Sequence, residues 1–222
     1  MANCCFTQIM FHGNKTEIED FHKKINDWTA DGVSKGRNTG FGDPWLGNIL
    51  YGVGLENRID AEKDTIRCRG SLIYVDDVHE FSDTEAVFYV ETETAWCPMI
   101  VMREETIKTL NYESIGFSYL AEEPGCGLFE IYDQYGDFSE KWYVHTFLNG
   151  ADRGNKKLAA FEDCITYHSD GVLKENLMSL LNVESEEIDL DALVDMVKDY
   201  KFEDEYSYIS IHKYERVDSW ND

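Results

Sequence analysis

The sequence CCFTQIMFH at residues 4–12, followed after a Gly-Asn turn by TEIE at residues 16–19, decides the fold. Along residues 4–12 both alternating sets of side chains contain apolar members, which predicts a central strand covered on both faces. In TEIE, Thr16 and Glu19 have the spacing of a capping box, which marks the start of a helix. A helix is predicted over residues 16–30, with apolar residues at helical spacing: Ile18, Phe21, Ile25 and Trp28.

Working outward from this pair, alternating apolar residues and turn signals predict further elements. Strands are expected over residues 66–75, 85–94, 115–121, 127–133, 141–148, 158–167 and 206–214. Helices are expected over residues 46–53, from near Met99, and over residues 171–182 and 188–201. The order as far as residue 121 is the split βαβ pattern of the ferredoxin-like fold.

We therefore expect an α+β fold with a ferredoxin-like (βαββαβ) core. To this core the sequence adds a β-hairpin, formed by residues 127–133 and 141–148, and a C-terminal helix-helix-strand extension. The expected division is a core with its hairpin over residues 1–150 and an extension over residues 151–222 that packs on the same core.

The charge of the chain restricts what it can bind. The chain contains 44 acidic and 20 basic residues, for a net charge of −24. Residues 1–75 carry 10 acids against 9 bases, residues 76–140 carry 16 against 2, and residues 141–222 carry 18 against 9. Nucleic-acid affinity depends on Lys and Arg that displace counterions from phosphates. We therefore expect the chain to bind neither nucleic acid nor an anionic membrane directly.

The sequence predicts a cytoplasmic protein of a bacterial host cell. No apolar run reaches the roughly 20 residues of a membrane span, and the first residues lack the pattern of a secretory signal. In a long chain without such a signal, six cysteines indicate reduced, mostly buried thiols.

Motifs that would carry chemistry are missing from the sequence. There is no CxxC pair, no HExxH string and no calcium-binding loop. The glycine-rich residues 31–47, with Lys35 and Arg37, lack the GxxxxGK[ST] pattern of a phosphate-binding loop. We expect no metal, no cofactor and no enzymatic activity. The alternative is a small hydrolase or nuclease with a carboxylate site or with a Cys/His pair drawn from His12, His145 and Cys164.

Three short motifs resemble those of the YubB-like group, ferredoxin-like domains of uncharacterised plasmid, phage and gut-bacterial proteins. They are the opening Met1-Ala2-Asn3-x-Cys5, the Trp96-Cys97-Pro98 before the second helix, and Glu123-Pro124-Gly125 after the fourth strand. Family members open with Asn-Trp-Cys, whereas Cys4 replaces the Trp here. The resemblance covers about residues 1–150. It implies carriage on a mobile element and transfers no catalytic residue.

These observations favour a non-enzymatic acidic binding protein of a phage or plasmid. We expect it to inhibit a host nucleic-acid-binding defence protein, as an anti-CRISPR or anti-restriction protein does, by occupying the basic surface of that protein as a nucleic-acid mimic. The alternatives are an accessory protein that self-associates or binds another kind of partner, and acids that only solvate the surface. Tyr206, Tyr208 and Tyr214 are candidate anchors. The partner-binding candidates are Asp76, Asp77, Glu91, Glu93, Glu122, Glu123, Glu203, Asp204 and Glu205.

Overall fold

A computed structural model describes residues 3–30, 44–59, 61–139, 142–161, 164–185 and 187–218. The chain has an α+β fold that divides into two compact units. The first unit comprises Met1–Phe138 together with Arg216–Asp222, and the second comprises Ser139–Glu215. Most of the predicted glycine-rich loop, including Lys35 and Arg37, lies outside the described residues.

The first unit is built on a seven-stranded sheet with β1 (Cys4–Asn14) near its centre. As predicted, β1 is flanked on both sides, by β4 (Glu85–Ala95) and by β5 (Gly116–Glu123), and both pairings are antiparallel. The sheet order is β10-β6-β5-β1-β4-β2, and β3 pairs with β4. The outer strands are β2 (Gly70–Val75), β3 (His79–Glu80), β6 (Leu128–Tyr132) and β10 (Glu215–Arg216).

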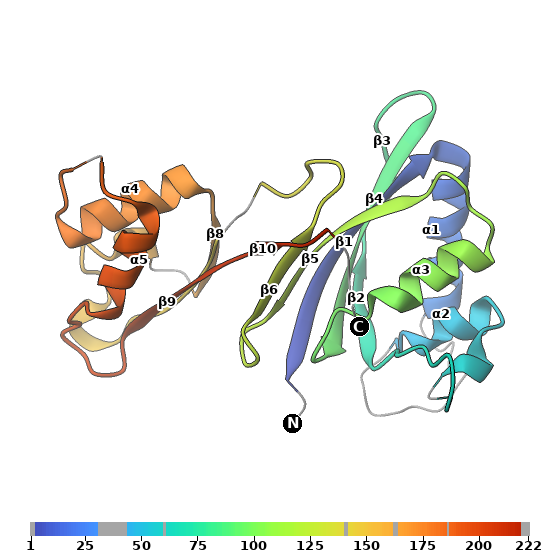
Figure 1. Ribbon diagram of the computed structural model, residues 1–222, viewed down its shortest axis with the longest axis horizontal. Helices are drawn as coiled ribbons and strands as arrows, with labels where there is room; N and C mark the ends of the chain where they lie inside the picture. Colours follow the sequence, from blue (N-terminus) through green and yellow to red (C-terminus); the bar gives the residue numbers. More distant parts are fainter. Residues whose placement is uncertain are drawn as a thin grey trace. The chain divides into compact units, whose positions relative to one another are not determined.

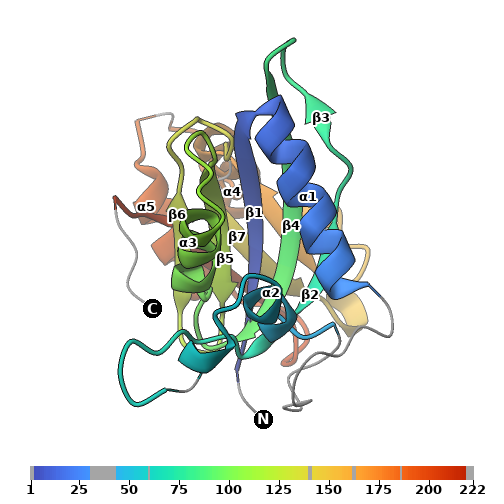
Figure 2. The same ribbon diagram turned by 90° about the vertical axis from the view of Figure 1, so that its right-hand side faces the viewer.

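Three helices lie over one face of this sheet, as the two views in Figures 1 and 2 show. They are α1 (Lys15–Thr29), α2 (Gly47–Gly52) and α3 (Ile100–Thr109), with a 3-10 turn at Glu56–Arg58. The α1 helix buries Phe21 against the rings of Phe11 and Phe88, with ring centroids 5.1 and 5.9 Å apart. Its N-cap is Asn14, whose side chain accepts a 3.0 Å hydrogen bond from the Thr16 backbone N–H, so the predicted cap at Thr16 is wrong by two residues.

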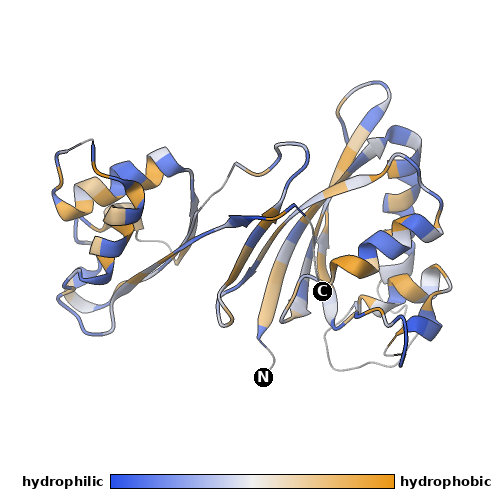
Figure 3. Cartoon of the chain, viewed as in Figure 1, coloured by the Kyte–Doolittle hydropathy of each residue, from blue (hydrophilic) through white to orange (hydrophobic). Residues whose placement is uncertain are grey.

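The second unit has its own sheet and its own hydrophobic core. Its three strands pair in the order β8-β7-β9. They are β7 (Trp142–Phe147), β8 (Ile165–His168) and β9 (Tyr208–Lys213). Apolar stripes of α4 (Asp170–Leu181) and α5 (Leu190–Lys198), visible in Figure 3, pack on one face of this sheet around Val144, Leu177 and Leu193. The unit also contains 3-10 turns at Gly150–Asp152 and Ala159–Phe161.

The structure corrects two parts of the predicted organisation. The hairpin expected from residues 127–133 and 141–148 does not form, because β6 pairs with β5 and β10 whereas β7 pairs with β8 and β9. The expected boundary at residue 150 is also wrong, since the division falls after Phe138. Trp142 and Val144 of β7 belong to the separate core of the second unit. Residues 151–222 therefore do not pack on a single shared core.

The cysteine prediction is confirmed in part. None of the six cysteines forms a disulfide, in line with the expected thiols. Only Cys5 and Cys68 are buried, however, while Cys4, Cys126 and Cys164 are exposed and Cys97 is intermediate, so the expectation of mostly buried thiols is wrong. No helix formed by the described residues combines the length and the apolar character that crossing a membrane requires.

Candidate functional site

Four of the predicted acids gather with one tyrosine at the β2 side of the large sheet. Tyr74 of β2 lies directly opposite Glu91 of β4, and Ser71 lies opposite Glu93. Val90 and Thr92 of β4 point into the core beneath the helices, so Glu91 and Glu93 point to the other face. We call this surface the acidic edge and define it by Tyr74, Asp76, Asp77, Glu91 and Glu93.

Asp76 is the centre of the hydrogen bonds within the acidic edge. Its carboxylate accepts from the Tyr74 hydroxyl at 3.0 Å and from the Asp77 backbone N–H at 2.9 Å. The Nε2 atom of His79 lies 2.9 Å from its other oxygen. The hydrogen bond from His79 is the largest of the contacts that lower the pKa of Asp76, so this group stays ionised at neutral pH. The network holds the exposed ring of Tyr74, 52% accessible, beside the carboxylates.

The acidic edge belongs to a sheet whose main strands carry no cation. The strands β1, β2, β4, β5 and β6 contain no Lys or Arg. Several cations of the helical layer are instead paired with nearby carboxylates: Lys15 with Glu80, Lys24 with Asp20 and Arg58 with Glu105. The five strands that lack Lys and Arg contain only acidic charged residues: Glu85, Glu91, Glu93, Glu122, Glu123 and Glu130.

The structure places Glu122 and Glu123 apart from the acidic edge. Phe6 of β1 lies between Glu93 of β4 and Glu122 of β5, each directly opposite it on one side. The side chain of Glu122, however, is only 7% exposed. Glu123 points to the opposite face and is 2% exposed. Its carboxylate accepts from the backbone N–H groups of Gly125 and Cys126 and thereby closes the β5–β6 turn. Glu123 therefore has a structural role.

The third predicted cluster lies in the second unit, before β9. The carboxylate of Asp152 accepts from the backbone N–H groups of Glu203 and Asp204, at 3.1 and 2.8 Å. Asp204 in turn accepts from Asn149 Nδ2 at 3.2 Å. Of the three predicted acids, Asp204 therefore shapes the loop, whereas Glu203 and Glu205 are exposed.

Aromatic side chains gather on the face of the second sheet that lies opposite α4 and α5. Phe147 lies opposite Tyr208, with stacked rings 6.2 Å apart. Tyr143 contacts Tyr167 and His212, with ring centroids 6.1 Å apart in each case. The three predicted tyrosine anchors differ in exposure. Tyr206 and Tyr208 are 66% and 42% exposed, whereas Tyr214 is buried.

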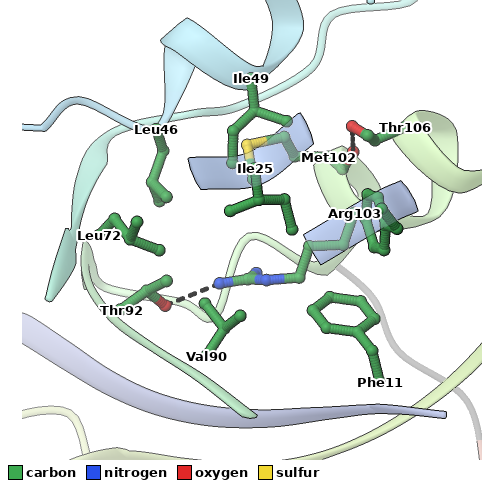
Figure 4. Close-up of a pocket in the computed structure, with 11 residues that line it drawn as sticks. Phe11, Ile25, Leu46, Ile49, Leu72, Val90, Thr92, Met102, Arg103 and Thr106 are labelled. Atoms are coloured by element: carbon green, nitrogen blue, oxygen red, sulfur yellow. Dashed lines mark hydrogen bonds between the residues drawn. The ribbon is translucent and has the colours of Figure 1, made fainter. Parts of the chain in front are cut away.

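A small cavity in the helical layer of the first unit is lined in part by the buried Arg103, as Figure 4 shows. Its guanidinium donates to Thr92 Oγ1 at 2.7 Å and to the Met99 carbonyl at 2.8 Å, and it also bonds the Pro98 carbonyl. The cavity encloses about 20 Å³, which is close to the space that one water molecule needs. Arg103 therefore anchors the start of α3 to β4.

The residues of the Cys/His alternative do not come together in the second unit. The backbone of Cys164 bonds Thr146, the neighbour of His145 along β7. Because successive strand residues point to opposite faces, Cys164 and His145 lie on opposite sides of that sheet. His12 belongs to the first unit. Within the described ranges, no group of three or more His, Cys, Asp and Glu side chains could hold a metal ion.

Comparison with protein-family models, curated proteins and solved structures finds no match to this chain. The resemblance to the YubB-like group therefore stays a prediction.

Tyr74 of the acidic edge and the neighbouring His79 escaped the sequence prediction. Tyr74 and His79 join the predicted acids through the hydrogen bonds of Asp76. Glu91 and Glu93 are two positions apart on β4 and therefore share a face. Tyr74 could be added only once its partner on β4 was known, because strand pairing is not encoded locally.

Proposed function

We propose that this chain is a non-enzymatic protein that binds, through its acidic edge, the basic nucleic-acid-binding surface of another protein. In this proposal the partner is a bacterial defence protein, such as a restriction enzyme or a CRISPR effector, and the chain competes with nucleic acid for its basic groove. The chain then belongs to a phage or plasmid and acts in the cytoplasm of the host.

The observation that carries the proposal is the position of Tyr74 beside Glu91 and Asp76 on strands that contain no Lys or Arg. An exposed aromatic ring supplies the anchor that protein interfaces often use. The surrounding carboxylates supply a negative potential that attracts a basic surface and speeds the encounter. The net charge of −24 adds a long-range attraction between the chain and a basic partner.

At the level of fold, we propose that the first unit is a ferredoxin-like domain. The elements β1, α1, β2, β4, α3 and β5 follow one another in the chain. Their strands lie in the order β5-β1-β4-β2, and each neighbouring pair is antiparallel. This is the arrangement that a split βαβ fold produces. In this proposal β3, β6 and β10 are additions.

Competition for nucleic acid tests the proposed function. A fluorescently labelled duplex or guide RNA is bound to each of a panel of purified restriction enzymes and CRISPR effectors, and the acidic protein is titrated in. We expect it to displace the nucleic acid from at least one of them. Its affinity for that protein should fall steeply between about 50 and 200 mM salt, as nucleic-acid binding does. Binding that is insensitive to salt and leaves the nucleic acid in place would contradict the proposal.

A further inference from the structure

A second site lies on the same sheet, at the end farthest from the N-terminus of β1. Here the face opposite the helices is hollowed into a pocket of about 250 Å³. Its lining includes two carboxylates, Glu85 and Asp137, two aromatic rings, Phe81 and Tyr135, and the imidazole of His12. None of its lining residues is Lys or Arg, and neither Glu85 nor Asp137 forms an ion pair within the described residues.

One wall of the pocket is fixed by a tight loop after β6. The carboxylate of Asp133 accepts hydrogen bonds from the backbone N–H groups of Tyr135, Gly136 and Asp137, at 3.2, 2.8 and 3.0 Å. Gly136 has a φ of +79°, a left-handed conformation that suits glycine. The loop thereby holds the ring of Tyr135 against His12 and the carboxylate of Asp137 at the pocket.

The polar groups of the pocket are incompletely satisfied by the protein itself. The Nε2 atom of His12 is buried and has no hydrogen-bond partner among the described residues, which costs free energy. Burial also raises the pKa of Asp137 and lowers the pKa of His12. The neutral imidazole does not repel a cation, and a bound cation would favour the ionised form of the Asp137 carboxylate.

We propose that this pocket binds a guanidinium group. A guanidinium is planar and stacks on aromatic rings such as those of Phe81 and Tyr135. Its N–H donors pair with two carboxylates, here those of Glu85 and Asp137. A metal ion fits the pocket less well, because no described group of three or more metal-binding side chains is present. The pocket volume suits a small molecule or one side chain. The site is independent of the proposed function, because its lining shares no residue with the acidic edge.

Calorimetric titration with n-butylguanidinium tests the site directly. Its uncharged isostere n-butylurea serves as the ligand control. We expect n-butylguanidinium to bind saturably and n-butylurea to bind with at least about tenfold lower affinity. A tenfold loss is on the order of what one charge-assisted hydrogen bond contributes. N-acetylarginine amide identifies the source of the group. If it binds as well as n-butylguanidinium, the pocket accepts an arginine side chain; if it does not, the pocket takes a free small molecule.

Matched variants separate this site from the general attraction of an acidic protein for cations. Asp137→Asn and Glu85→Gln should each weaken n-butylguanidinium binding by about tenfold, and Phe81→Ala by about threefold. The control Asp83→Asn removes the same charge from an exposed position of the β3–β4 hairpin and should have less than a twofold effect. Circular dichroism checks the fold of each variant, and Glu85 and Asp137 lie on different segments, so one variant remains informative if the other unfolds. Absence of saturable binding, or equal losses in Asp83→Asn and Asp137→Asn, would overturn the proposal.

Discussion

Tyr74 on the edge strand β2 lies directly opposite Glu91 on β4, and both side chains point away from the helical layer. The Tyr74 hydroxyl donates to Asp76, so the ring is fixed within a group of carboxylates. The acidity of the composition is therefore present, at this position, as a defined surface: an exposed ring surrounded by carboxylates.

Tyr74→Ala should weaken binding of the basic partner by roughly tenfold or more. An aromatic side chain that becomes buried in an interface often contributes much of its binding energy. The matched variant is Tyr206→Ala, which removes an exposed ring from the second unit, 66% accessible against 52% for Tyr74. Surface plasmon resonance at fixed salt compares the two. If Tyr206→Ala costs more than Tyr74→Ala, the contact surface lies on the second unit and the acidic edge is not the anchor.

The carboxylate of Glu93 should control the reactivity of a neighbouring thiol. The hydrogen bond from Cys4 to Glu93, together with partial burial and nearby negative charge, raises the pKa of Cys4. Since the thiolate is the reactive form, Glu93→Gln should speed the labelling of Cys4 by a maleimide at pH 8. The rate at the exposed Cys164 should stay unchanged. Equal rates at Cys4 in both proteins would show that the Glu93 carboxylate does not contact that thiol.

Cys5 should remain unlabelled in the folded protein. It is fully buried on the helical side of β1, and burial is the main cause that raises its pKa to about 11. At pH 8 about one molecule in a thousand then carries the thiolate. Mass spectrometry after timed labelling should find Cys126 and Cys164 modified first and Cys5 only in denaturant. Rapid native labelling of Cys5 would contradict its burial in the core of the first unit.

Asp133 should link stability to pH. Burial tends to raise the pKa of this group, but hydrogen bonds from four backbone N–H groups outweigh burial and lower it. A group with a lowered folded-state pKa stabilises the fold above its unfolded pKa of about 3.9, and that contribution is lost as the pH falls through the folded value.

Asp133→Asn should therefore lower the free energy of unfolding at pH 7 by roughly 1 kcal/mol. The variant should also lose less of its remaining stability between pH 7 and pH 3 than the parent does. Thermal unfolding at both pH values measures this difference, with Asp83→Asn as the exposed control. A parallel acid response in parent and variant would show that Asp133 is not the titrating group.

A methyl group at Gly13 should destabilise the first unit. A Cβ there would lie 2.7 Å from the backbone oxygen of Ser114, a contact that neither chain segment can easily relieve. We expect Gly13→Ala to cost about 1–3 kcal/mol. Gly171→Ala in α4 is the control, because a Cβ there meets no atom within 4 Å and alanine favours a helix. Urea unfolding distinguishes the two, and equal stabilities would contradict the close approach at Gly13.

Local sequence patterns predicted most of the individual elements but not all of their partners. The alternation in β1 and the helical spacing in α1 reflect burial, which acts residue by residue and leaves a readable period. The pairing of β7 with β8 and β9 was missed, because a hairpin with β6 satisfies the same local pattern. Likewise Asn14 and Thr16 are both good caps, and only the backbone conformation selects Asn14.

The candidate site was predictable to the extent that it depends on alternation. Glu91 and Glu93 are two positions apart on a strand, so their shared face follows from the sequence. Glu123 looked like an equally good candidate, yet it caps a turn and is buried. That distinction depends on the geometry of Gly125 and Cys126, which sequence spacing does not contain.

The double variant Glu91→Lys/Glu93→Lys tests the central claim most directly, when its affinity for the basic partner is compared with that of Glu184→Lys/Glu187→Lys. Both changes alter the net charge equally, and Glu184 and Glu187 are exposed residues of the second unit. Our account predicts that the first variant loses at least about tenfold more affinity than the second and no longer displaces nucleic acid. Equal losses in the two variants would show that only the total charge matters and would contradict an acidic edge that binds the partner.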